Sequence, residues 1–292
     1  MASTQLLKRR IRSITNTKQI TKAMELVAAA KLRRVQEAAQ KSRIYSDAAI
    51  SILRRLSHSP EATRHPYFTP PTSRSKLYVI FTSDSGLAGA YNSNLFNAAG
   101  RAFAEDSKSG AQPMIIVFGR KGARHFSRGS NVELIGDYEN IADDPDINVF
   151  APVIETISDG VAEGRFSSVA LIYTESISTM KQQVRTLQLV PVEPPAQSDE
   201  GENDKATVVY EFEPDVTVVL EEALKLYFQS TLRRARVEAA ASEHAMRMMS
   251  MGNANRNAGD LIDDLTLELN ATRQAAITQE VAEIIGGAAA IA

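Results

Sequence analysis

Apolar residues recur at helical spacing in both terminal thirds of the chain, and these segments almost lack the residues that break helices. All 11 prolines lie between Pro60 and Pro214, together with 11 of the 15 glycines, and residues 1–59 contain neither type. Because proline and glycine interrupt helices, we predict one helix of up to about 55 residues before Pro60 and another of about 70 after Pro214. They would measure about 80 and 105 Å at 1.5 Å per residue.

The apolar positions of the first segment form a narrow seam with the 4,3 spacing of a coiled coil. The spacing begins at Leu7, Ile11 and Ile14, and it resumes one residue out of phase at Ile20, Met24 and Val27. It then returns to the first phase at Ala28, Leu32, Val35, Ala39, Ala49, Leu53 and Leu56. The last segment carries a similar seam at Val216, Leu220, Ala223, Tyr227, Ile262, Leu265 and Leu269. We therefore expect the two helices to pair, with a phase shift near the middle of the first.

The middle of the chain alternates short apolar runs with helical patterns. Strands are expected at 77–81, 114–118, 132–135 and 169–173, and helices at about 92–105 and 149–163. This alternation is typical of a parallel α/β sheet. Residues 184–190 and 208–212 are compatible with an added edge hairpin, with a polar loop over 197–205. We predict three segments, namely a coiled-coil helix over 1–59, a Rossmann-like α/β domain over 60–213 and a second coiled-coil helix over 214–292.

Charge is distributed unevenly along the chain, although the net charge is only -2. Residues 1–59 carry 13 basic and 3 acidic groups, a net of +10, whereas residues 215–292 carry 7 and 11, a net of -4. A basic segment of this kind suits nucleic acid, anionic lipid or an acidic protein. Its basic residues are not interleaved with aromatic ones, as they are in single-stranded nucleic-acid platforms. A solvated face, or one that meets an acidic protein, is therefore favoured over nucleic acid.

The longest apolar runs, at 77–81 and 114–118, are far shorter than the roughly 20 residues that cross a bilayer. The N-terminus has no signal-peptide pattern, and we expect a cytoplasmic protein. The chain has no cysteine, which excludes disulfides and thiolate chemistry.

One loop invites a nucleotide-binding interpretation, because glycines that enter a helix can hold phosphate. Gly86 and Gly89 give only Gly-x-x-Gly, without the remaining glycine of a dinucleotide fingerprint or the lysine of a P-loop. A structural turn is the favoured interpretation. The four histidines, His58, His65, His125 and His244, do not form a metal-binding pair at helical spacing. We find no catalytic constellation, metal site or cofactor site.

Three blocks of sequence resemble the gamma subunits of bacterial rotary, F-type ATP synthases. They are residues 8–33 (KRRIRSITNTKQITKAMELVAAAKLR), residues 82–94 (TSDSGLAGAYNSN), and the pair formed by residues 241–251 (ASEHAMRMMSM) and 273–280 (RQAAITQE). Their order and spacing match the family along essentially the whole chain. The family often has a cysteine where Ala88 stands, and the regulatory cysteine insertion of chloroplast members is missing, so thiol regulation is not expected.

The resemblance implies a long antiparallel coiled coil inside a ring of three alpha and three beta subunits, with an α/β domain at its foot. Such a subunit is a non-catalytic rotor, present in one copy, that couples proton flow through the membrane c-ring to ATP synthesis or hydrolysis at the beta subunits. It is a peripheral protein on the cytoplasmic face of the plasma membrane and also contacts an epsilon subunit. The implied contacts with beta subunits are Lys22, Met24, Arg273, Gln274, Thr278 and Glu280, and those with the membrane ring and epsilon are Tyr210, Glu211, Phe212 and Glu213.

Two other classes of function remain open on the residues alone. A nucleotide-dependent enzyme would use the loop at Gly86 to Gly89 and would bind ATP or NAD in calorimetry. A coiled-coil nucleic-acid scaffold would use the +10 segment, and its binding to DNA would weaken steeply with salt.

Overall fold

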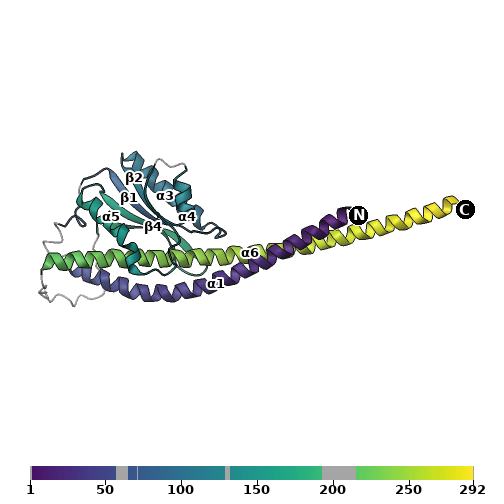
Figure 1. Cartoon of the computed structure of the whole chain (residues 1–292), viewed down its shortest axis with the longest axis horizontal. Coiled ribbons are helices and arrows are strands. Elements are labelled where there is room, and N and C mark those ends of the chain that lie inside the picture. Colours follow the sequence, from purple (N-terminus) through teal and green to yellow (C-terminus); the bar gives the residue numbers. More distant parts are fainter. Residues whose placement is uncertain (1, 57–64, 71, 129–131, 193–214, 292) are drawn as a thin grey trace. The chain divides into compact units, whose positions relative to one another are not determined.

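The computed structural model describes residues 2–56, 65–70, 72–128, 132–192 and 215–291 (Figure 1). Two helices account for both ends of the chain, α1 over Ala2–Leu56 and α6 over Val216–Ile291. The chain forms two compact units, residues 1–30 with 247–292, and residues 31–246. The two long helices predicted from the placement of proline and glycine are confirmed. The expected domain boundaries, at 59/60 and 213/214, lie outside the described residues and stay predictions.

The second unit contains a five-stranded sheet with the order β3-β2-β1-β4-β5. Its strands are β1 (Ser75–Phe81), β2 (Gln112–Phe118), β3 (Glu133–Tyr138), β4 (Ser168–Ser176) and β5 (Gln182–Val190). The first four run parallel, while β5 pairs antiparallel with β4 at the edge. The parallel α/β sheet is confirmed, as is the strand at 184–190. The second strand of the expected hairpin, 208–212, and the loop at 197–205 lie outside the described residues.

Both faces of this sheet are covered, because side chains alternate along each strand. On one face, Tyr78, Ile80, Ile115 and Val117 pack with residues of α3 (Tyr91–Lys108) and α4 (Arg120–Phe126). The basic stretch after Gly119, for which we expected no helix, forms α4. It follows directly from β2, and its apolar positions Ala123 and Phe126 are buried.

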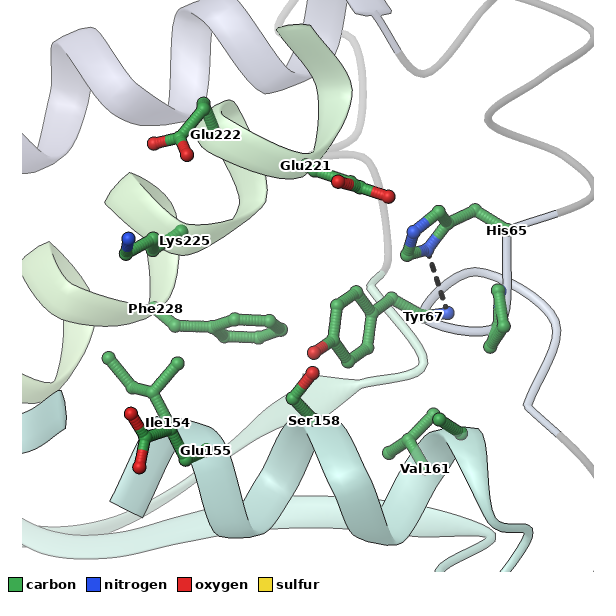
Figure 2. Close-up of a pocket in the computed structure, with 12 residues that line it drawn as sticks. His65, Tyr67, Ile154, Glu155, Ser158, Val161, Glu221, Glu222, Lys225 and Phe228 are labelled. Atoms are coloured by element: carbon green, nitrogen blue, oxygen red, sulfur yellow. Dashed lines mark hydrogen bonds between the residues drawn. The ribbon is translucent and has the colours of Figure 1, made fainter. Parts of the chain in front are cut away.

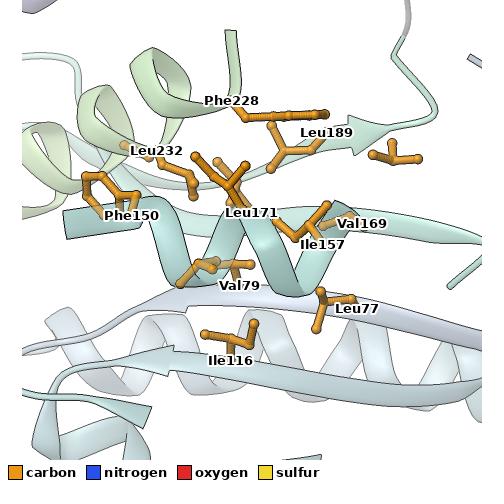
Figure 3. Close-up of a cluster of buried hydrophobic side chains, with 14 of the residues drawn as sticks. Leu77, Val79, Ile116, Phe150, Ile157, Val169, Leu171, Leu189, Phe228 and Leu232 are labelled. Atoms are coloured by element: carbon orange, nitrogen blue, oxygen red, sulfur yellow. The ribbon is translucent and has the colours of Figure 1, made fainter. Parts of the chain in front are cut away.

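The opposite face carries the larger core, to which both α5 and α6 contribute side chains (Figure 3). The expected helix at 149–163 is a 3-10 turn, η1 (Ile147–Phe150), followed by α5 (Ala151–Ala162). Ile157 of α5 lies against strand residues such as Val79 and Leu171, and Phe228 and Leu232 of α6 join the same cluster. The first part of α6 is therefore a layer of the α/β unit, and Ala235 and Ala239 are buried in this cluster.

Gly160 permits the closest approach in this core. A Cβ atom at Gly160 would lie well inside contact distance of the fully buried Phe166 ring. Phe166 thus packs directly against the backbone of α5, which only glycine allows.

Candidate functional site

In the first unit, the beginning of α1 pairs in a continuous seam with the section of α6 that contains Gly252, Asn255 and Gly259. Seven buried or half-buried positions on this part of α1 keep the 4,3 spacing without interruption, namely Leu7, Ile11, Ile14, Lys18, Thr21, Glu25 and Ala28, and Thr4, Thr15, Met24 and Ala29 are half-buried beside them. The predicted phase shift is therefore wrong. The seam passes through three polar residues, Lys18, Thr21 and Glu25, whereas the prediction assigned only apolar residues to it. Ile20 and Val27 were therefore assigned to the seam, although they are 60% and 57% exposed.

Glycines on α6 explain how polar residues fit this seam. A Cβ atom at Gly259 would lie 2.9 Å from the Lys18 ammonium nitrogen, and one at Gly252 would lie 3.6 Å from the Glu25 carboxyl carbon. The long side chains of Lys18 and Glu25 therefore lie over positions that carry no side chain. Asn255 lies between the two glycines and donates a hydrogen bond from Nδ2 to the Lys18 carbonyl oxygen at 2.8 Å.

Outside the seam, α1 presents an exposed apolar stripe formed by Ile20, Met24 and Val27. Ile20 and Val27 are exposed, and Met24 is half-buried. Lys22, also expected to contact a partner, is exposed and forms an ion pair with Glu25 at 3.2 Å. A stripe of this kind on a coil marks a surface available to another protein.

The end of α6 presents a second exposed surface. Arg273, Gln274, Thr278 and Glu280 are all exposed, as are the apolar residues Ile277, Val281, Ile284 and Ile285. At about 100° per residue these eight positions lie within about half of the helix circumference. Sequence reasoning placed the polar members correctly on an exposed helix, whereas Tyr210, Glu211, Phe212 and Glu213 lie outside the described residues.

The glycine loop after β1 is held by its own side chains. Ser83 accepts a hydrogen bond from Asn92 Nδ2 at 2.7 Å and donates to the Ser85 carbonyl oxygen at 2.8 Å. The Asp84 carboxylate accepts from the backbone N–H groups of Arg120 and Asn140, each at 3.1 Å. Polar groups that a phosphate would need are thus used within the fold, which supports the structural interpretation of this loop.

A cleft of about 500 Å³ lies beside the start of α6 in the second unit (Figure 2). The Tyr67 side chain lies beside those of Phe228 and Ser158. The rings of Tyr67 and Phe228 meet edge to face, with their centroids 4.9 Å apart. Burial lowers the pKa of His65, and the carboxylate of Glu221 partly opposes this effect. His65 Nδ1 accepts from the Tyr67 backbone N–H at 3.3 Å. This nitrogen is therefore engaged, and the cleft offers no activated nucleophile among its described residues.

A buried ionic cluster joins a loop of the α/β unit to α6. Asp143 accepts hydrogen bonds from His244 Nε2 at 2.8 Å and from Arg236 at 3.3 Å, and Arg236 also donates to the Ile141 carbonyl oxygen. Burial raises the pKa of Asp143, but His244, Arg236 and Lys31 outweigh this and lower it to about 2. From the sequence, His244 was considered only as a metal ligand and its burial was not predicted, and the structure shows it 3% exposed.

No helix within the described ranges combines the length and the apolar character needed to cross a membrane. The same residues contain no group of three or more histidine, aspartate or glutamate side chains able to hold a metal ion.

The architecture defines a class of proteins in which the two ends of one chain form a coiled coil and the middle forms a Rossmann-like α/β domain. Residues 3–291 match the ATP synthase family model. The ATP synthase gamma chains of Pelotomaculum thermopropionicum and of Stenotrophomonas maltophilia strain R551-3 are each 37% identical to the chain, with all of both chains covered. The chain belongs to the ATP synthase gamma chain family.

Solved structures share the fold. A chain in a structure of the Euglena gracilis mitochondrial ATP synthase, comprising OSCP, F1 and the c-ring, has a TM-score of 0.68 at 18% identity, covering 99% of this chain and 95% of that one. A chain of the Tetrahymena thermophila mitochondrial ATP synthase central stalk and c-ring has a TM-score of 0.60 at 23% identity, covering 80% and 99%.

Proposed function

We propose that this chain is the central rotor shaft of a bacterial proton-transporting ATP synthase and does not itself catalyse a reaction. The match to gamma chains over the full length carries this proposal. The two helices of 55 and 76 residues support it, because a shaft that transmits torque needs long, regular elements. In this role one copy of the chain sits within three alpha and three beta subunits and joins an epsilon subunit and the membrane c-ring.

The shaft would act by shifting the populations of open and closed beta subunits. A rotor changes such an equilibrium only when it contacts the two states differently in each orientation. The exposed stripe of Ile20, Met24 and Val27, with the neighbouring Lys22, is a suitable contact because it occupies one side of α1 only. The coil surface is therefore asymmetric, as this mechanism requires.

The exposed end of α6 would form the second contact with beta subunits. Arg273 and Gln274 offer hydrogen-bond donors, Thr278 and Glu280 offer acceptors, and apolar residues lie among them. The segment Tyr210 to Glu213 would contact the membrane ring and epsilon; this assignment rests on resemblance alone. With these partners the protein would be peripheral, on the cytoplasmic face of the plasma membrane.

Reconstitution with alpha and beta subunits tests the proposal. The chain should assemble with them into a complex that hydrolyses ATP and rotates a probe attached to the α/β unit. Failure of the folded chain to enter such a complex would refute the proposal.

The double variant Arg273→Ala with Gln274→Ala tests the contact at the end of α6. Both side chains are exposed, so the isolated chain should unfold as the unchanged chain does, while torque and ATP synthesis in the complex decrease. The matched control is Arg256→Ala with Asn257→Ala, an exposed arginine followed by an amide residue on the same helix. Equal coupling in the two double variants would remove Arg273 and Gln274 from the contact.

A further inference from the structure

A polar cleft in the second unit is lined by a residue whose buried carboxylate oxygen has no hydrogen-bond partner among the described residues. The cleft has a volume of about 380 Å³ and is lined by α1, by the end of β4 with the turn after it, and by α6. Glu238 of α6 lines it, and this residue is only 3% exposed. Its Oε1 atom accepts from Arg234 Nε at 3.1 Å, whereas its Oε2 atom is buried and has no partner among the described residues.

The unpaired oxygen belongs to the carboxyl group that pairs with Arg234 at 3.1 Å. The carboxylate of Glu238 helps to raise the pKa of Arg234, against the lowering effect of burial, and with burial it raises the pKa of Tyr173. A buried charged acceptor without a donor is costly, and in most proteins such an atom is satisfied by a bound group or by water. The Oε2 atom of Glu238 is therefore an acceptor for which the described residues provide no donor.

Charge and wall chemistry define what fits. Arg234 is shared between Glu238 and the more distant Asp47, at 3.8 Å, so two carboxylates face one guanidinium. A buried carboxylate oxygen that only accepts and has no donor among the described residues favours a ligand that brings N–H donors and a positive charge. The cleft wall adds the amides of Gln36 and Gln40 and the hydroxyls of Ser176 and Ser178. Neutral oxygen groups around one carboxylate suit a group with several N–H donors.

We propose that this cleft binds an organic cation with N–H donors, an ammonium or guanidinium group, which donates to Glu238 Oε2. Gln36 and Gln40 are exposed side chains of the cleft lining, and their rotation would give the cation access to the buried oxygen. The cation is either a free small molecule or a lysine or arginine side chain of an assembled subunit. For the second source, the neighbouring turn offers apolar contact through Ile177 and Met180, which are 50% and 83% exposed.

Calorimetry on the isolated full-length chain tests the first source, with agmatine and putrescine as probes at constant ionic strength. Tetramethylammonium, a cation without N–H donors, is the control ligand. We expect saturable binding of at least one probe, at least tenfold weaker in Glu238→Gln and unchanged in Glu37→Gln, an exposed carboxylate on α1. Gln40→Trp, which covers the cleft without touching the Arg234 pair, gives the same loss should Glu238→Gln fail to fold.

Photo-crosslinking in the assembled complex tests the second source, with a photoreactive amino acid at Gln40. The expected product joins this position to a segment of an alpha, beta or epsilon subunit that contains lysine or arginine. Changing that basic residue to glutamine should accelerate dissociation of the chain as much as Glu238→Gln does. The proposal is overturned if no probe binds saturably and no basic segment is crosslinked, because water alone then satisfies Oε2. This result leaves the rotor proposal untouched, since the calorimetry needs no assembly.

Discussion

Replacing Asp143 by asparagine tests the ionic cluster that joins the α/β loop to α6. The carboxylate faces His244 and Arg236 on α6 and Lys31 on α1, and its pKa is lowered from 3.8 to about 2. At 1.36 kcal/mol per pKa unit, this difference corresponds to about 2.4 kcal/mol. The Asp143 side chain is 31% exposed, so solvent screening reduces the expected loss to about 1–2 kcal/mol at pH 7.

The direction of the pKa shift predicts how the stability difference between the two proteins changes with pH. Because the pKa of Asp143 is lower in the folded chain, its contribution to stability is complete well above pH 3.8 and is lost as the pH falls toward 2. Urea unfolding of the isolated chain should therefore show a difference between the two proteins at pH 7 that shrinks below pH 3.8.

A neighbouring residue provides the control for this experiment. Asp144 also forms an ion pair with an arginine, Arg233, at 2.8 Å, but its side chain is 41% exposed. Asp144→Asn should therefore cost less than about 1 kcal/mol. An equal loss of stability in Asp143→Asn and Asp144→Asn would show that the interactions of Asp143 with His244, Arg236 and Lys31 add nothing beyond a more exposed ion pair.

Two further predictions concern packing and contact. Gly160→Ala should lower the free energy of unfolding by about 1–3 kcal/mol, because the added methyl group overlaps the Phe166 ring. The control is Gly100→Ala, at a helical glycine with open space around it, which should leave the free energy of unfolding unchanged or raise it in the same urea titration. Ile20→Ala with Val27→Ala should leave the isolated chain at least as stable, since both side chains are exposed and alanine favours helix, but should weaken coupling in the assembled complex; unchanged coupling would show that the stripe is not a contact.

Much of the fold followed from residues that act locally. Proline and glycine end helices wherever they occur, so their confinement to the middle of the chain predicted α1 and α6. The order of the sheet depends on pairings between strands distant in sequence, such as β1 with β4, which short apolar runs do not encode. The antiparallel placement of β5 is a local hairpin with β4, in which Ser176 lies opposite Gln182. The helix α4 was missed because only Ala123 and Phe126 mark its buried side, amid basic residues.

The contact surfaces also combine features that local residues predict with features that depend on the facing helix. An apolar residue on a long helix is assigned to the seam by default, so Ile20 and Val27 were misplaced. The correct assignment needed the facing helix, since only Gly252 and Gly259 reveal why Glu25 and Lys18 occupy seam positions. The uninterrupted 4,3 spacing from Leu7 to Ala28 was a usable signal, had polar residues been allowed in it. The unpaired oxygen of Glu238 depends on three elements distant in sequence and left no local trace.

The two helices of the coil should resist sliding along each other less strongly where Lys18 and Glu25 face Gly259 and Gly252 than where apolar side chains interlock. An interlocked apolar layer resists axial movement because each side chain must leave the hole it fills. Lys18 and Glu25 instead lie across backbone that presents no side chain at Gly259 and Gly252, so a small shift there displaces flexible chains over a smooth surface. The bond from Asn255 to the Lys18 carbonyl oxygen is then the main restraint on that shift. Under load, shear between the two helices should concentrate in this short section, with Asn255 acting as its stop.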